Sequence, residues 1–209
     1  MRKRTVLPLA ALLALSGCSS EKKPNAANFT KAINQYLADH GQECTYFAQP
    51  FPIDVPAAEL KDQSGTPAQM AALERAGLVR GNDTTAVIHG MMGALGPSAP
   101  RPVRRYVLTD EGRKYFQIKP GILGQSSVFC YGHEAVDSVV TWTKPESMGS
   151  ALQSEVTYTY KMPDLAPWAK QTDVQQVFGD IRTTVNGISK AHESVSLQLT
   201  NKGWEVPEQ

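Results

Sequence analysis

The residues best suited to acid–base chemistry in this 209-residue chain are His133, Glu134 and Asp137, where an imidazole and two carboxylates cluster in the sequence. In an extended strand, His133 and Asp137 would point to the same face, because side chains alternate along a strand. His133 also follows Gly132 between two predicted strands, where an exposed turn histidine is the more common case. The cluster is therefore the candidate site for a hydrolase or transferase, as the alternative to a binding function.

Other catalytic signatures are missing from the sequence. No His-Glu-x-x-His motif or comparable spacing of three or four ligands occurs, so we expect neither a metal site nor a cofactor. The serines within 96–98 and 124–127 do not lie in the Gly-x-Ser-x-Gly pattern of a nucleophile elbow. Neither glycine-rich nucleotide-binding motif is found, which argues against nucleotide chemistry.

Cys44 and Cys130 are predicted to form a disulfide. They are the only cysteines after Cys18, and both lie in segments with the composition of strands. In an oxidising compartment, two such thiols pair more often than they bind a metal or carry out redox chemistry. A thiol nucleophile assisted by a histidine is the other use of these residues, but a disulfide would engage both sulfurs.

The N-terminus has the layout of a secretory signal: Met-Arg-Lys-Arg precedes an apolar run that extends to Leu15. The run has about eleven residues, too few to span a bilayer, which needs about 20. It ends in Leu15-Ser16-Gly17-Cys18, which resembles the lipobox of bacterial lipoproteins.

This resemblance implies that residues 1–17 are a signal peptide that is removed and that Cys18 carries the acyl chains, palmitate among them, that anchor the protein. Residues 18–27 are polar and are predicted to be a lipidated tether, about 30 Å long when extended. Many lipoproteins retained in the inner membrane carry aspartate after the cysteine. Ser19 at this position favours the outer membrane, on its periplasmic face.

Helical periodicity and capping residues predict three helices in the first half of the chain. The first begins at Asn28 and ends at Gly41, the second begins at Thr66-Pro67 and ends at Gly77, and a short third helix follows Thr109. Strands are expected within 44–48, 78–88 and 103–108.

Residues 66–116 resemble the helix-wing-helix end of winged-helix regulators, through Leu-Glu-Arg-Ala-Gly-Leu-Val at 73–79 and Arg-Tyr-Val-Leu-Thr-Asp-Glu-Gly-Arg at 105–113. In that family the helix before the wing enters the DNA major groove. Here this helix offers only Arg75 beside Glu74, and export separates the protein from the chromosome, so we expect no nucleic-acid partner. The basic residues of the wing instead become candidates for docking an anionic partner: Arg101, Arg104, Arg105 and Arg113.

The second half of the chain predicts strands within 127–131, 135–143 and 153–162, a helix after Asp173 and a final hairpin around Asn201-Lys202-Gly203. The expected fold is α+β, with a winged-helix-like part at 28–120 and an antiparallel sheet packed on one helix at 121–209. The boundary is placed near 117–125. Strand aromatics are expected to fill the core or, alternatively, to line a groove or a pocket under the helix at 173–186: Trp142, Tyr158, Tyr160 and Trp168.

The formal net charge of +1 gives no sign of a nucleic-acid or strongly acidic partner. The interpretation we favour is a membrane-anchored periplasmic binding or adaptor lipoprotein without catalytic activity, which docks a protein or an envelope component such as peptidoglycan. The alternative is a small hydrolase or transferase that acts on envelope polymers through the region of His133, Glu134 and Asp137.

Overall fold

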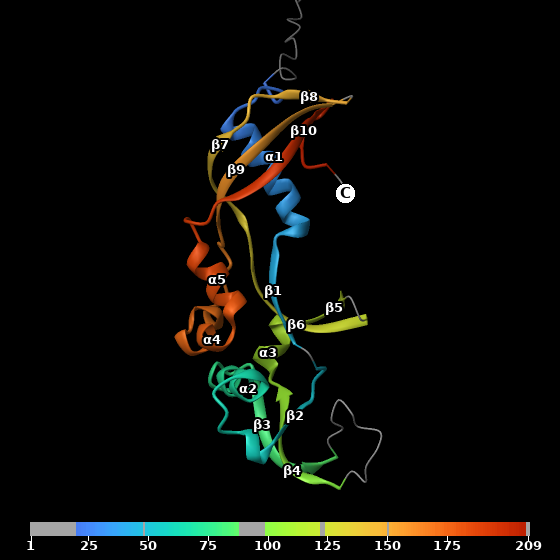
Figure 1. The fold of residues 1–209 in the computed structure, drawn as a ribbon, viewed down its shortest axis with the longest axis vertical. Coiled ribbons are helices and arrows are strands. Elements are labelled where there is room, and N and C mark those ends of the chain that lie inside the picture. The colour runs from blue at the N-terminus through green and yellow to red at the C-terminus, as the bar shows by residue number, and fades with distance from the viewer. Residues whose placement is uncertain (1–19, 48, 88–98, 122–123, 150, 208–209) are drawn as a thin grey trace, which may run out of the picture.

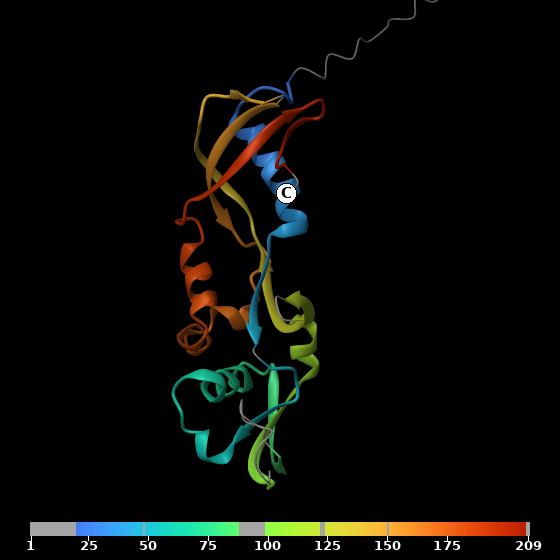
Figure 2. The same cartoon turned by 45° about the vertical axis from the view of Figure 1, so that its right-hand side comes forward.

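Three antiparallel sheets follow one another along the long axis of the body, with helices packed beside them (Figures 1 and 2). The computed structural model describes residues 20–47, 49–87, 99–121, 124–149 and 151–207. Its helices and antiparallel strands form an α+β fold, as predicted. Cys18 and the rest of the lipobox lie outside the described residues. No helix within the described ranges combines the length and the apolar character needed to cross a membrane.

One end of the body is a sheet covered by the first helix. The sheet contains β7 (Ala135–Trp142), β8 (Glu146–Met148), β9 (Ala151–Lys161), β10 (Glu193–Thr200) and β11 (Gly203–Glu205). The order is β11-β10-β9-β7, and β8 also pairs with β9. Helix α1 (Ala26–His40) packs on β7 and β11, and its Phe29 makes edge-to-face contacts with Trp142 and Trp204.

The position and the start of α1 correct two predictions. The sheet of the second half is covered by α1, from the start of the chain, and not by the helix expected at 173–186. That helix is divided at Phe178 into α4 (Thr172–Val177) and α5 (Gly179–Gly187), which lie beyond the end of this sheet (Figure 1). In addition, Asn25 rather than Asn28 caps α1, so part of the tether expected at 18–27 belongs to the folded body.

The middle sheet joins the two halves of the chain. It consists of β1 (Gln42–Phe47), β6 (Gly124–His133) and β5 (Phe116–Gly121), in the order β1-β6-β5. The boundary expected near 117–125 falls inside the β5–β6 hairpin. In addition, β1 of the first half pairs with β6 of the second half, so both halves contribute strands to this sheet. Cys44 lies opposite Cys130 in this pairing, and the predicted disulfide between them is confirmed.

The opposite end of the body contains β2 (Ile53–Pro56), β3 (Val79–Ala86) and β4 (Arg101–Leu108), in the order β2-β4-β3. Two helices, α2 (Gly65–Arg75) and α3 (Asp110–Tyr115), flank the β3–β4 hairpin. Short 3-10 helices lie at Ala57–Glu59 and Pro167–Lys170. The order of helix, hairpin and helix matches the expected order, whereas kinship with winged-helix regulators stays a prediction. Helix α2, which in this prediction corresponds to the DNA-contacting helix of the winged-helix family, packs against α4 and is therefore partly covered.

Aromatic side chains fill the interior instead of lining a groove. Tyr158, Tyr160 and Trp168 are buried, and Trp142 is the partly exposed member of the predicted set, covering Phe29. Around Phe129, edge-to-face contacts link the middle sheet to Trp168 and to the neighbouring phenylalanines. The alternative of an aromatic groove is therefore not favoured by the structure, since three of its four side chains are inaccessible.

Replacing both cysteines with alanine is expected to lower the free energy of unfolding by about 4 kcal/mol, because the bond spans a sequence separation of 86 and restricts the unfolded chain. Urea unfolding with and without reductant measures the effect. The Cys44→Ala/Cys130→Ala variant should not respond to reductant, which provides the control. A loss below about 1 kcal/mol would mean that the pairing of β1 with β6 does not depend on the bond.

Candidate functional site

A small polar cleft lies on the middle sheet, beside the loop that follows β9. Its cavity volume is about 180 Å3. The loop is held against β6, where the backbone N–H of Ala166 donates to the carbonyl of Tyr131 at 2.8 Å. Gly132 of β6 lies close to this loop, because a Cβ there would be 3.4 Å from Cα of Leu165 and 2.8 Å from the methyl group of Met162. The polar side chains among the lining residues are those of Gln42, Lys114, Tyr115, Gln117, Tyr131, His133 and Asp164.

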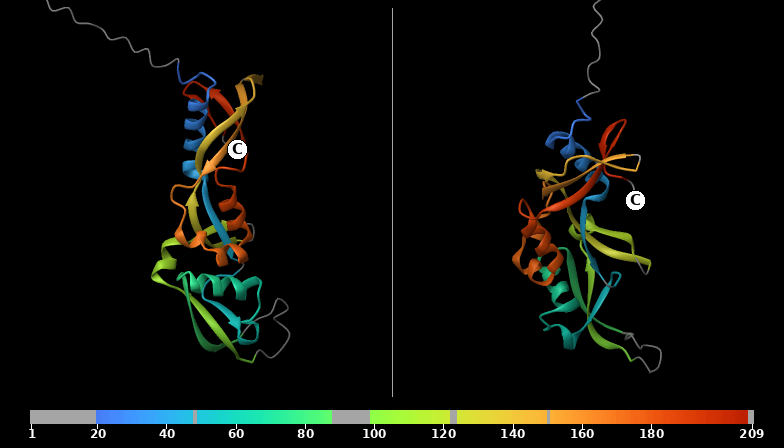
Figure 3. Two further views of the ribbon diagram at one scale, coloured as in Figure 1. Left: turned by 90° about the vertical axis from the view of Figure 1, so that its left-hand side faces the viewer. Right: turned by 45° about the horizontal axis from the view of Figure 1, so that its top comes forward.

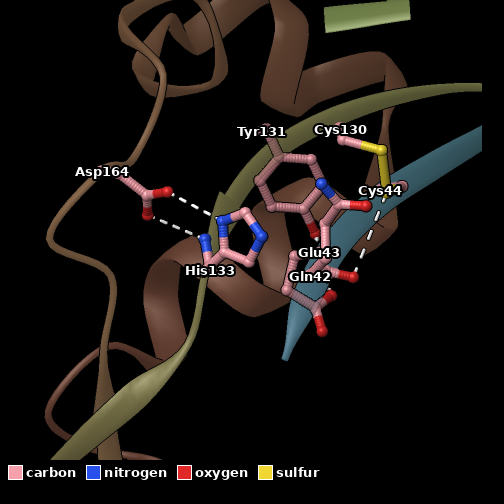
Figure 4. The surroundings of a disulfide bond; sticks show 7 residues. All are labelled: Gln42, Glu43, Cys44, Cys130, Tyr131, His133 and Asp164. Carbon is pink, nitrogen blue, oxygen red and sulfur yellow. Dashed lines mark hydrogen bonds and ion pairs between the residues drawn. A yellow bond between two sulfur atoms is a disulfide. The ribbon is translucent and has the colours of Figure 1, made fainter. Parts of the chain in front are cut away.

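Asp164 orients the imidazole of His133 at the wall of this cleft (Figure 4). The backbone N–H of His133 donates to Oδ1 of Asp164 at 2.8 Å, and Nδ1 of the ring lies 2.8 Å from Oδ2. Burial raises the pKa of Asp164, but the hydrogen bonds from His133 outweigh it and hold this pKa below its usual range. When Nδ1 carries the proton, Nε2 is left to accept a hydrogen bond from a ligand.

The residues expected to act with His133 do not join it. Glu134 lies near Glu43 and Glu193, whereas the carboxylate bonded to His133 belongs to Asp164. Asp137 is exposed and is the extra residue of a bulge, because the pairing with β9 shifts between Val136 and Ser138. No single regular strand contains both residues, so the alternation that predicted a common face for His133 and Asp137 does not apply. The bulge and the end of β6 at His133 interrupt the regular alternation of side chains.

Asp164 was missed because it is far from His133 in the sequence, in the segment Pro163 to Pro167 that breaks the strand pattern. Its sequence signal is only that of a turn, in which aspartate is common. A metal site was not expected, and the described residues contain no group of three or more His, Cys, Asp or Glu side chains arranged to hold a metal ion.

A second group of ionisable residues surrounds Glu134. Burial raises its pKa to about 7, and repulsion from Glu43 and Glu193 adds to the effect. Burial also raises the pKa of Glu43, although the hydroxyl of Tyr131, 3.4 Å from Oε2, opposes the change. The carboxyl groups of Glu134 and Glu43 therefore stay protonated to a higher pH than a solvent-exposed glutamate does.

The arginines predicted to dock a partner are mostly engaged within the chain. Arg105 makes a bidentate pair with Asp54 of β2, with both distances 2.7 Å. Arg104 donates to Glu74 of α2 at 2.8 Å and to Asp83 of β3 at 3.1 Å.

The remaining two arginines differ from each other. Arg113 pairs with Asp110 of the same helix and donates to the carbonyl of Leu108. Arg101 is exposed at the start of β4 and makes no ion pair with another described residue. The charges expected to attract a partner thus hold β2, β3 and α2 around β4, and Arg101 is the predicted docking arginine whose charge is least committed.

Arg105→Glu is expected to destabilise the protein measurably, because it removes the pair with Asp54 and places two carboxylates opposite each other. Arg101→Glu makes the same change of charge at an exposed position and should alter stability by less than about 0.5 kcal/mol. Urea unfolding of both variants tests this difference. Equal effects would mean that the Arg105 pair contributes nothing measurable.

Glu134→Gln is expected to stabilise the protein above neutral pH. Since the folded pKa of about 7 exceeds the ordinary value of 4.5, the stabilisation from proton binding is complete below pH 4.5 and is lost as pH rises through about 7. Glutamine avoids this loss, so we expect a gain on the order of 1–2 kcal/mol at pH 8 and little change at pH 4. Urea unfolding at both pH values tests this, with the exposed Glu155→Gln as control. The same gain at pH 4 and pH 8 would contradict the assignment.

No known protein offers a role that could be transferred to this chain by similarity. No protein-family model, no curated protein and no solved structure matches this chain.

Proposed function

We propose that this chain is a lipid-anchored periplasmic binding protein that docks a protein or another envelope component such as peptidoglycan and does not catalyse a reaction. The anchor rests on the lipobox Leu15-Ser16-Gly17-Cys18, with the acyl chains on Cys18. Ser19 supports the outer membrane as the destination. Binding rests on one structural observation, the polar cleft on the middle sheet.

The size of the cleft favours a large partner over a free small molecule. Its volume of about 180 Å3 is below the ~300–1,000 Å3 that is typical of small-molecule sites. A cleft of this size accommodates one side chain or one sugar ring that projects from a larger partner. The cleft presents donors and acceptors on paired strands, with the imidazole of His133 fixed by Asp164. Such fixed polar groups confer specificity, because a partner that lacks the matching groups leaves them unpaired.

This site replaces the basic wing as the docking point of the proposal. A partner that bound through Arg104 or Arg105 would have to compete with Glu74, Asp83 and Asp54 for the guanidinium groups. The side chains of Gln42 and Gln117 lie at the cleft without a comparable cost in broken ion pairs.

The second candidate is a hydrolase or transferase that acts on envelope polymers. The observation that favours it is the pairing of His133 with Asp164, because a carboxylate that orients an imidazole is the usual support of a general base. This candidate requires a substrate bond, and a water or hydroxyl nucleophile, within reach of Nε2 of His133.

Photo-crosslinking in intact cells tests the binding site. A photoreactive phenylalanine at Gln117, in the cleft, should give a light-dependent adduct with a specific partner. Ile118 provides a matched control, because it is the next residue of β5 and is exposed rather than in the cleft lining. Equal adducts at 117 and 118, or none at 117, would contradict docking at the cleft.

Combining the Gln117 probe with His133→Ala separates the two candidate functions. Binding at the cleft predicts a several-fold loss of adduct. An enzyme that uses His133 as a base predicts instead that turnover of purified envelope polymer disappears while the adduct is largely retained.

A further inference from the structure

The residues that follow Cys18 are bound to the folded body instead of forming a free tether. The side-chain amide of Asn28 donates to the carbonyls of Ser20 and Lys23, at 2.7 and 2.9 Å. The indole N–H of Trp204 donates to the carbonyl of Lys22 at 3.2 Å, and Glu21 pairs with Lys31 at 2.8 Å. The segment is thereby attached to both α1 and β11.

This attachment leaves very little free chain between the lipid and the body. Only Ser19 separates Cys18 from Ser20, so their Cα atoms lie at most about 7 Å apart. The ten-residue tether expected from the sequence would have reached about 30 Å. An acylated Cys18 therefore places this end of the body at the lipid head groups.

Two hairpin turns lie at the same end as Ser20. Leu152 of β9 is paired with Ser147 of β8 on one side and with Leu199 of β10 on the other. The turn after Met148 and the turn at Asn201-Lys202 therefore lie at the same end of the strands (Figures 1 and 3). The second of these turns also lies beside Glu21, since a Cβ at Gly203 would be 3.3 Å from the carbonyl oxygen of Glu21.

The chemistry of this end suits a phospholipid surface. Lys22, Lys23 and Lys202 are exposed, and Met148 is 63% exposed, the largest exposed fraction among the large hydrophobic residues of the described chain. Lysines attract phosphate head groups, and an exposed apolar side chain gains from entering the interface. Of the acidic residues nearby, Glu21 is paired with Lys31, Glu146 lies on β8, and Glu205 lies at the end of β11.

We infer that this end, formed by Lys22, Lys23, Lys202 and Met148, is a membrane-contacting surface that binds anionic phospholipid head groups and fixes the orientation of the body. The inference rests on the lipid anchor of the proposed function. The long axis then points away from the membrane, with the middle sheet part-way along it and β3 and β4 at the far end (Figure 1). The cleft lies on that middle sheet.

Fluorescence quenching tests the orientation in the full, lipidated protein. Met148→Cys and Thr85→Cys, the latter exposed on β3 at the far end, are each labelled with a fluorophore. The proteins are reconstituted in phosphatidylethanolamine and phosphatidylglycerol vesicles that contain a head-group nitroxide lipid. We expect strong quenching at 148 and at least fivefold weaker quenching at 85. Equal quenching, or none at 148 in vesicle-bound protein, would overturn the inference.

The contribution of the lysines is tested by the variant Lys22→Glu/Lys23→Glu/Lys202→Glu. Quenching at 148 should fall at least twofold in this background, since the anchor remains but the contact with the head groups is weakened. The hydrogen bond to Trp204 uses the backbone of Lys22, so the fold of the segment is retained. Unchanged quenching would exclude the lysines from the contact.

The mass of the purified protein reports acylation separately. Protein without acyl chains would contradict the anchor of the proposed function. For such protein, co-sedimentation with phosphatidylglycerol vesicles that is lost in the triple variant would still support the surface. Absence of co-sedimentation would overturn it.

Discussion

The pairing of β1 with β6 is the interaction on which the rest of the structure depends. Residues 42–47 and 124–133 are far apart in the sequence, yet they form adjacent strands that the Cys44–Cys130 bond joins covalently. Helix α1 directly precedes β1 in the chain, and β7 directly follows β6. The pair therefore leads into both the helix and the first strand of the sheet at one end of the body. The cleft and the two other sheets are positioned from these strands, so the two halves of the chain share one sheet and one covalent cross-link.

Electrostatic interactions have different roles in the three regions of the body. At the far end, carboxylates from three elements engage Arg104 and Arg105 and join the small sheet to α2. In the middle, Asp164 uses both carboxylate oxygens to orient one imidazole. Near α1, lysines remain exposed beside the segment that follows the lipobox. A count of basic residues does not distinguish these roles, because only the positions of the carboxylates decide which charges are available to a partner.

Irregular pairing explains why the candidate site differed from the expected one. The register of β1 and β6 shifts between Glu43 and Cys44, and that of β7 and β9 shifts beside Asp137. Each shift changes which residues share a face, so an argument from simple alternation fails at these positions. The partner of His133 comes instead from a loop 31 residues away.

The sequence by itself determined the α+β class and much of the local structure: most of the strands, the C-terminal hairpin and the helix after Thr109, although β2, β5 and β8 were not predicted. The side chain of Thr109 caps this helix by accepting from the N–H of Gly112. These features follow from periodicity and capping, which involve residues close together in the chain. The prediction that Cys44 pairs with Cys130 succeeded because only two cysteines remained after Cys18.

Only the tertiary structure decided that α1 covers the sheet of the second half, that Asp164 holds His133, and that the predicted docking arginines are largely paired. The reason is physical: apolar faces and charged side chains are satisfied by any suitable partner that packing brings near. The identity of that partner depends on contacts between distant residues, which periodicity and spacing do not encode.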